Sequence, residues 1–274
     1  MEPIRIDDPD DPRIASFREV RERDLVGREG RFVAEGAVVL SVLVASTRHR
    51  AEAVLIDERR LDSLAATLAR LPETTPVHIA SRRVVDAIAG FPLHRGILAI
   101  GRRAAPLSAE MLVAGLGERA VVVVACGIAN HDNIGGIFRN AAAFGADAVL
   151  LDAECCDPFY RKAIRVSVGH VLTVPQARLA AGADPVSLLR AAGFDVLSLS
   201  PSAGRRLVDV VPPKRAAIVL GTEGAGLAPE VLARSQAVAI PMAAGVDSLN
   251  VAVTSGIVLH HLTAPRDRAA PTPG

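Results

Sequence analysis

The sequence predicts an α/β protein with a mostly parallel sheet that is covered by helices on both faces. Short apolar runs rich in β-branched residues alternate with helix-like segments along the chain. Half of the 274 residues are hydrophobic, which is enough for a sizeable core. Strands and helices that alternate in this way form parallel sheets with helices on both sides.

The first part of the alternation, residues 1–105, is predicted to be a small α/β domain with a charged N-terminal extension. Pro72 and Gly90 lie where two of its helices should end, and Ser81 can cap one of them. The expected elements are a short arginine-rich helix at 11–28, helices at 34–45, 61–71 and 81–89, and strands at 51–57, 77–80 and 96–100.

A linker at 104–107 leads to a longer α/β series, predicted to be a second domain at 113–264. The expected strands are 121–126, 147–151, 171–174, 194–199, 216–220 and 238–241, and the expected helices are 134–144, 161–168, 185–192 and 249–262. The Pro-rich residues 265–274 are expected to be a disordered tail.

Composition excludes several classes of protein. The longest apolar run, 120–129, is shorter than the ~20 residues that cross a bilayer, and the charged N-terminus does not resemble an export signal. Three cysteines form neither a disulfide framework nor a zinc motif, so we expect no metal and a cytoplasmic location. The net charge of +1 neither requires nor excludes RNA, and 3% aromatic residues argue against a stacking platform for single strands.

The first segment with chemical potential is 130–139, directly after a predicted strand. Asp132 or Asn133 can cap the following helix. Two glycines in the first helical turn are unfavourable, which suggests that another group approaches the backbone there. Arg139 flanks the apolar stripe of this helix. The alternative is a surface arginine beside a capping residue.

The second segment, 221–226, is a glycine-rich loop after an apolar strand. Leu227 stands where a P-loop needs lysine, and Pro229 stands where a dinucleotide fingerprint needs a small residue. Glu223 would lie at the carboxyl end of its strand, where open α/β sheets bind ligands. The alternative is a turn with a solvated glutamate.

The third segment, 240–250, leads into the last predicted helix. Asp247 or Ser248 can cap that helix, and Asn250 would lie in its first turn beside unpaired backbone N–H groups. The alternative is that Ser248 is only a cap. The adjacent His260 and His261 point to different sides of a helix and cannot form a metal pair.

Together these segments resemble the three motifs of the SpoU (TrmH-type) RNA 2′-O-methyltransferases of the SPOUT superfamily. The motifs are Asn133-x-Gly135-x-x-x-Arg139, Gly221-Thr222-Glu223-Gly224-x-Gly226-Leu227, and Ile240-Pro241-Met242 with Ser248-Leu249-Asn250-Val251. The resemblance covers 121–261, and 162–169 also resembles a family segment. Residues 31–36 and 94–96 resemble an L30-like substrate-binding domain. Asn130-His131 and Thr254 depart from the usual family residues.

The resemblance implies a C-terminal trefoil-knotted parallel sheet preceded by a smaller L30e-like α/β domain, and a homodimer whose active site is completed near the subunit interface. It implies methyl transfer from S-adenosylmethionine to a ribose 2′-hydroxyl in structured rRNA or tRNA. The implied catalytic residues are Arg139, Asn133, Glu223, Ser248 and Asn250. The implied cofactor-binding residues are Leu220, Gly221, Gly224, Ile240, Met242, Ser248 and Leu249.

Two points stay open. Arg139 could act as a general base or, because a guanidinium hardly deprotonates, as a stabiliser of the developing alkoxide or of a nearby phosphate. The chain could also be an inactive RNA-binding or cofactor-sensing protein, or a methyltransferase for a small molecule. Local basic pairs are the candidates for RNA contact, at 82–83, 102–103, 161–162 and 205–206.

Overall fold

The computed structural model describes residues 2–18, 26–27, 29–89, 96–222, 224 and 226–264. The chain divides into two compact units, one of residues 1–105 with 157–173, and one of 106–156 with 174–274. Residues 157–173 therefore group with the first unit, although they lie inside the range 113–264 expected for the second domain. The expected disordered tail, 265–274, lies outside the described residues. No helix within the described ranges is long and apolar enough to cross a membrane.

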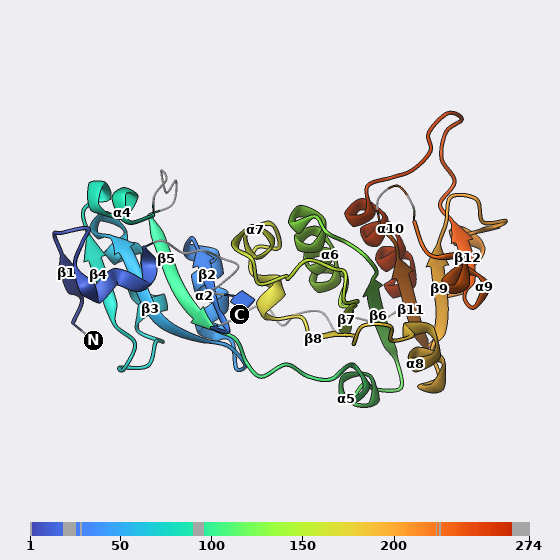
Figure 1. The fold of residues 1–274 in the computed structure, drawn as a ribbon, viewed down its shortest axis with the longest axis horizontal. Helices are drawn as coiled ribbons and strands as arrows, with labels where there is room; N and C mark the ends of the chain where they lie inside the picture. The colour runs from blue at the N-terminus through green and yellow to red at the C-terminus, as the bar shows by residue number, and fades with distance from the viewer. Residues whose placement is uncertain are drawn as a thin grey trace. The chain divides into compact units, whose positions relative to one another are not determined.

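The first unit contains a mixed five-stranded sheet in the order β1-β4-β3-β5-β2 (Figure 1). Strands β1, β4 and β3 are parallel, and β5 runs antiparallel to both β3 and β2. The strands are β1 Ile4–Ile6, β2 Arg31–Glu35, β3 Arg50–Asp57, β4 Val77–Ala80 and β5 Ile97–Arg102. The helices are α2 Ala37–Ala45, α3 Leu61–Leu68, α4 Arg82–Ala89 and α7 Arg161–Val166, with 3-10 turns η1 Pro12–Phe17, η2 Glu58–Arg60 and η3 His170–Leu172.

One prediction for the first unit is wrong in part, and another falls largely outside the described residues. Residues 34–35, expected at the start of a helix, belong to β2, whose whole length pairs with β5. Helix α2 starts only after Gly36, whose φ of 91° turns the chain out of the strand. At the predicted helix 11–28, residues 12–17 form the 3-10 turn η1, and most of the remainder lies outside the described residues.

The second unit contains a seven-stranded, all-parallel sheet in the order β10-β12-β9-β11-β6-β7-β8. The predicted parallel sheet is thus confirmed here. The strands are β6 Ala120–Ala125, β7 Ala148–Leu151, β8 Gln176–Arg178, β9 Asp195–Leu199, β10 Arg205–Arg206, β11 Arg215–Leu220 and β12 Gln236–Ala239. The helices are α5 Ala109–Ala114, α6 His131–Phe144, α8 Pro185–Ala191, α9 Pro229–Ala233 and α10 Val251–Thr263, with a 3-10 turn η4 at Leu207–Asp209.

The predicted strand 171–174 is wrong. Residues 170–172 form the 3-10 turn η3, and the strand at this point of the sheet is β8, three residues long. Val168 and Gly169 adopt φ values of 55° and 87°, which reverse the chain directly before η3 and prevent an extended run. The buried side chains of Val171 and Leu172 gave the segment its strand-like apolar pattern.

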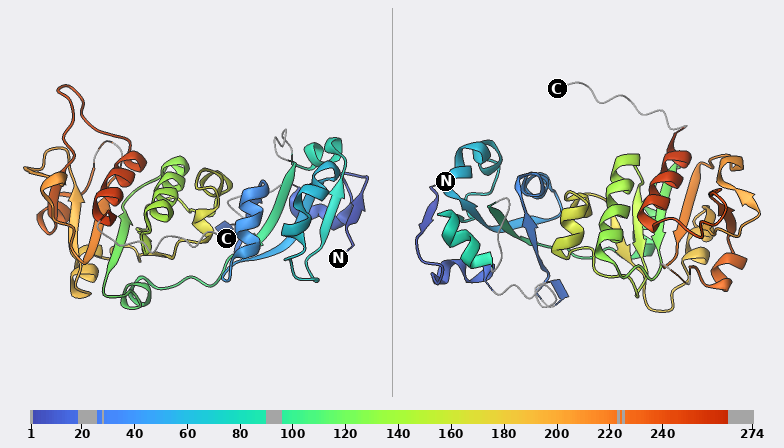
Figure 2. Two further views of the ribbon diagram at one scale, coloured as in Figure 1. Left: turned by 180° about the vertical axis from the view of Figure 1, so that it is seen from behind. Right: turned by 90° about the horizontal axis from the view of Figure 1, so that it is seen from above.

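Helices α6 and α10 lie side by side in the second unit (Figure 2). Their contact is close because Gly136 of α6 faces Ala252 of α10, where a Cβ on residue 136 would come within 2.6 Å of the alanine methyl group. Helix α10 also packs against β11, although β12, the strand before it, is separated from β11 by β9. The chain between β12 and α10 therefore crosses the carboxyl ends of the neighbouring strands.

Candidate functional site

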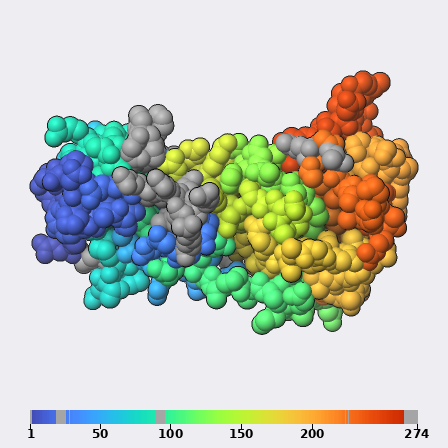
Figure 3. All heavy atoms as spheres, viewed as in Figure 1, coloured from blue at the N-terminus to red at the C-terminus, as the bar shows by residue number. Residues whose placement is uncertain are grey.

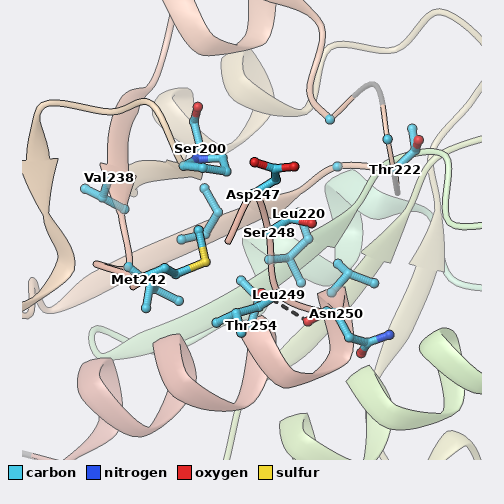
Figure 4. Close-up of a pocket in the computed structure, with 17 residues that line it drawn as sticks. Ser200, Leu220, Thr222, Val238, Met242, Asp247, Ser248, Leu249, Asn250 and Thr254 are labelled. Carbon is cyan, nitrogen blue, oxygen red and sulfur yellow. Dashed lines mark hydrogen bonds between the residues drawn. The ribbon is translucent and has the colours of Figure 1, made fainter. Parts of the chain in front are cut away.

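A cavity of about 570 Å³ lies at the carboxyl ends of β9, β11 and β12 (Figure 4). Its walls come from the loop after each of these strands and from the first turn of α10. The loop between β12 and α10, orange-red in the figures, protrudes from the surface beside it (Figures 1 and 3). The lining residues are Leu199, Ser200, Pro201, Leu220, Gly221, Thr222, Gly224, Gly226, Val238, Ile240, Met242, Asp247, Ser248, Leu249, Asn250, Val251 and Thr254.

The loop after β11 folds back on itself. The backbone N–H of Gly226 donates to the Thr222 carbonyl at 3.2 Å. A Cβ on Gly221 would lie 2.5 Å from the backbone carbon of Gly226, so no other residue fits there without moving the loop. Gly224 has a φ of 92°, in the left-handed region. Gly221 and Gly224 thus line the cavity with backbone and no side chain. Glu223 lies outside the described residues.

Asn250 connects the cavity to two helices. It is the N-cap of α10, because its Oδ1 accepts hydrogen bonds from the backbone N–H groups of Ala252 and Val253 at 2.9 and 3.2 Å. Its Nδ2 donates to Oδ1 of Asn133 at 2.8 Å. The predicted caps of this helix, Asp247 and Ser248, are therefore wrong, and both residues instead line the cavity.

On α6, Asn133 is buried in the first turn and reaches Asn250. The N-cap of α6 is Asn130, whose Oδ1 accepts from the N–H of Asp132, so the predicted caps Asp132 and Asn133 are wrong. Further along, Asn140 donates from Nδ2 to the Ala252 carbonyl and to Ser255 Oγ, at 2.6 and 2.9 Å. These bonds attach the first turns of α10 to α6.

The structure brings most of the predicted site residues together. The residues predicted to bind the cofactor all line the cavity, as do the predicted catalytic residues Ser248 and Asn250. Asn133 joins them through its hydrogen bond to Asn250. Arg139 lies on the exposed side of α6 and is not part of the cavity wall. The individual roles of these residues stay predictions.

Several lining residues were not singled out from the sequence. Ser200 and Pro201 follow β9 directly, and Thr222 and Thr254 lie beside predicted site residues. The rule that ligands bind at the carboxyl ends of parallel strands applies to β9 as well as to β11. This rule would have identified Ser200 if the sequence had shown that β9 and β11 are adjacent in the sheet.

The cavity wall is mostly neutral. Among the described lining residues, Asp247 is the only one with an ionisable side chain; the others supply apolar groups, hydroxyl groups, an amide and backbone. Burial raises the pKa of the Cys126 and Cys155 thiols to about 12, so neither is a ready nucleophile. The described part of the chain holds no group of three side chains suited to a metal ion.

The basic pairs considered for RNA contact are largely engaged with carboxylates. Those in ion pairs are Arg82 with Asp86, Arg102 with Glu52, Arg103 with Asp157, and Arg206 with Asp209. Arg161 approaches the buried Glu35 at 3.8 Å. The acidic partners offset much of the local positive charge at these positions, so a phosphate would have to compete with a carboxylate for each guanidinium.

Known proteins resemble the chain in sequence and in fold. The model of the SpoU rRNA Methylase family matches residues 120–260. An uncharacterised tRNA/rRNA methyltransferase of Mycobacterium bovis is 38% identical over 265 residues, covering 93% of this chain and 90% of that protein. The 23S rRNA (guanosine-2′-O-)-methyltransferase RlmB of Salmonella typhimurium is 28% identical over 239 residues, covering 84% and 97%. The crystal structure of the SpoU methyltransferase AviRb from Streptomyces viridochromogenes, in complex with AdoMet, has a TM-score of 0.78 at 22% identity and covers 93% and 98%.

Proposed function

The chain belongs to the SpoU rRNA methylase family, and from this premise we propose that it transfers a methyl group from S-adenosylmethionine to a ribose 2′-hydroxyl of structured rRNA or tRNA. The observation that carries the proposal is the convergence of the second and third sequence motifs on one cavity, joined to the first motif through Asn133 and Asn250. The relatives named for RNA methylation, including RlmB, support the reaction and the substrate class.

The cavity suits the methyl donor. Its volume of about 570 Å³ lies within the range of small-molecule sites. Leu220, Ile240, Met242 and Leu249 offer apolar surface for a nucleobase, and the backbone around Gly221 offers hydrogen-bonding groups without a side chain in the way. When bound, S-adenosylmethionine supplies an electrophilic methyl group on a sulfonium. AviRb, whose fold is similar, was crystallised with this molecule.

The remaining task of the protein is to orient the ribose and stabilise its oxygen as negative charge develops. We assign the charge stabilisation to Arg139, because its guanidinium stays protonated and is therefore a better electrostatic partner than a base. Asn133, Ser248 and Asn250 hold the loop against which the ribose lies. Glu223 is expected to orient the ribose or Arg139.

We further propose that the protein acts as a cytoplasmic homodimer, with α10 and the loop before it at the interface. Leu249, Val253 and Ile257 are spaced four residues apart, and their exposed fractions are 37%, 52% and 38%. Val253 and Ile257 lie on α10 and Leu249 directly precedes its N-cap, so together they form an exposed apolar stripe along the start of α10 that is suited to a partner surface. A second copy covering it would complete the wall of the active site. The knot and the L30e-like character of the first unit stay expectations of the family resemblance.

The dimer can be tested separately from the reaction. Val253→Asp together with Ile257→Asp places charges on the stripe, and we expect monomers in analytical ultracentrifugation where the unmodified protein sediments as a dimer. Lys214→Asp, at an exposed position outside α10 and the loop before it, is the control for a change of charge. A double variant that remains dimeric would place the interface elsewhere.

The reaction is tested in two steps. Calorimetry measures binding of S-adenosylmethionine, and a tritiated methyl group is then followed into total rRNA and tRNA from a strain that lacks the gene. Digestion to nucleosides and mass spectrometry identify the product. We expect a 2′-O-methyl nucleoside. Binding without transfer to any RNA would favour a sensing or RNA-binding protein, and transfer to a small molecule alone would contradict RNA as the substrate.

A further inference from the structure

Asp247 stands out among the residues of the cavity. It lies in the loop between β12 and α10, directly before Ser248, and Figure 4 shows its carboxylate over the cavity between Ser200 and Thr222. Of the described lining residues, it alone carries an ionisable side chain. The sequence suggested only that this residue caps α10, a task that Asn250 performs.

The carboxylate of Asp247 has no structural partner among the residues that the structure describes. Within the described part of the chain it makes no ion pair and no side-chain hydrogen bond, unlike Asp184, whose carboxylate caps α8 and contacts Arg234 at 2.5 Å. A negative charge without a protein partner at the wall of a ligand cavity is available to a positively charged ligand. No contact in the described part of the chain therefore requires an acid at this position.

The reaction proposed above changes the charge of the molecule in the cavity. S-adenosylmethionine carries a sulfonium, an ammonium and a carboxylate, a net charge of +1. Loss of the methyl group leaves a thioether, so that S-adenosylhomocysteine has no net charge. The two molecules are otherwise almost the same in shape. A neutral cavity would bind both about equally, and accumulated product would then block the enzyme.

We propose that Asp247 is the residue by which the cavity distinguishes the cationic donor from the neutral product. The inference rests on the proposed function. The carboxylate attracts the sulfonium through space and has no corresponding attraction for the thioether, so it favours donor binding and product release. Because Asp247 is exposed and partly screened by solvent, its discrimination between the two ligands should be about fivefold to tenfold.

Calorimetry with three probes tests this assignment. The probes are S-adenosylmethionine, S-adenosylhomocysteine and sinefungin, which carries an amine in place of the methylated sulfonium. Asp247→Asn keeps the size and polarity of the side chain and removes its charge. We expect the Kd of the two cationic probes to rise about fivefold to tenfold and the Kd of S-adenosylhomocysteine to change less than about twofold.

Two further variants serve as controls. Asp247→Glu retains the charge and should keep most of the preference for the cationic probes. Glu230→Gln removes an equal charge from the exposed surface of α9, outside the cavity, and should leave all three Kd values unchanged. Raising the salt concentration should weaken the preference of the unmodified protein and have little effect on that of Asp247→Asn.

An equal loss of affinity for all three probes in Asp247→Asn would show that the carboxylate binds the shared amino-acid part and would overturn the inference, as would an unchanged preference. Either result leaves the proposed function intact, because the unmodified protein still binds the donor and methylates RNA. If the unmodified protein binds none of the probes, it is the proposed function that fails.

Discussion

At the scale of single residues, Asn250 shows how one side chain can serve both the fold and the site. Its Oδ1 caps α10, its Nδ2 holds Asn133, and its position in the cavity wall depends on both bonds. Asn133 is buried, so its oxygen would lose a partner if Asn250 were shortened. The stability of α10 and the shape of the cavity are therefore linked through this residue.

Two substitutions separate these roles. Asn250→Ala removes the cap and the bond to Asn133, and we expect a loss of about 2 kcal/mol in the free energy of unfolding measured with urea. Asn250→Ser retains a capping oxygen but is too short to reach Asn133. It should recover about half of the lost stability and still bind S-adenosylmethionine poorly. Full binding in Asn250→Ser would mean that the link to Asn133 does not shape the cavity.

Arg139 is the residue whose role most needs a functional test, because it lies on α6 outside the cavity wall. We expect Arg139→Ala to reduce kcat about 100-fold or more, the usual effect of removing a group that stabilises developing charge. The Kd of S-adenosylmethionine should change less than about twofold, since the side chain does not line the cavity. Arg190→Ala, on the exposed surface of α8, is the control. Turnover at the unmodified rate would remove Arg139 from the mechanism.

At the scale of elements, the contact between α6 and α10 determines where Asn133 and Asn250 meet. Gly136 is required by the approach of Ala252, and Gly256 of α10 faces Asn140 at a distance that leaves little room for a Cβ. Asn140 then donates to the Ala252 carbonyl and to Ser255 Oγ. Small residues allow the helices to approach closely, and the Asn140 amide fixes the axial register between them.

Gly136→Ala tests this packing. Alanine favours a helix by about 1 kcal/mol over glycine, but its methyl group would overlap Ala252, so we expect a net loss of about 1–2 kcal/mol in unfolding free energy. Ala252→Gly removes the opposing methyl group. The double variant should be at least about 1 kcal/mol more stable than the sum of the single effects predicts. Additive effects would mean that the two residues do not constrain each other.

The helices and strands that could be predicted from the sequence are those with a strong local signal. The buried strand β6 and helix α8, which begins with an Asp184 cap followed by proline, follow the expected pattern closely. Strand β2 could not be separated from α2, because its apolar residues continue directly into the helix and only Gly36 divides them. The cap of α10 was misplaced because Asp247, Ser248 and Asn250 are all good capping residues, and only the bond to Asn133 distinguishes them.

The position of the candidate site could be predicted because its motifs are recognisable as a set, whereas the roles of its residues stay predictions. Leu220, Ile240 and Leu249 line the cavity as expected. Ser200 could not be found, because nothing in the local sequence places β9 beside β11 and β12. The importance of the charge of Asp247 could not be predicted from the neighbouring sequence either, because it depends on the neutral side chains that line the same cavity.

At the scale of the whole molecule, buried histidines should make the first unit lose stability in acid. In the first unit His49 is buried against Phe32 and Phe159, and its Nδ1 accepts a hydrogen bond from the N–H of Ala104. Burial, with the nearby Arg48 and Arg103, lowers the pKa of His49 to about 4. Burial also lowers the pKa of His78 in the same unit.

Acid lowers the stability of the folded chain because the folded chain holds His49 in its neutral form. The unfolded chain takes up a proton near pH 6.5 and the folded chain only near pH 4, so the contribution of His49 is present above pH 6.5 and is lost as the pH falls through this window. The full loss in the free energy of unfolding is about 3 kcal/mol. We expect Tm to fall between pH 6.5 and 4, and His49→Gln, which keeps an acceptor and does not titrate, to flatten that slope. An unchanged slope would show that other groups cause it.

The place of β11 in the second unit affects how the chain must be made. Strand β11 comes from the last quarter of the sequence, yet it sits between β6 and β9 and is hydrogen-bonded to both. A nascent or prematurely terminated chain that stops before residue 215 already contains β6 and β9 but lacks β11. Each of these two strands then has an unpaired edge. Such fragments carry apolar strands ready to pair with other chains, so interrupted synthesis of this protein should yield aggregates rather than a soluble partial fold.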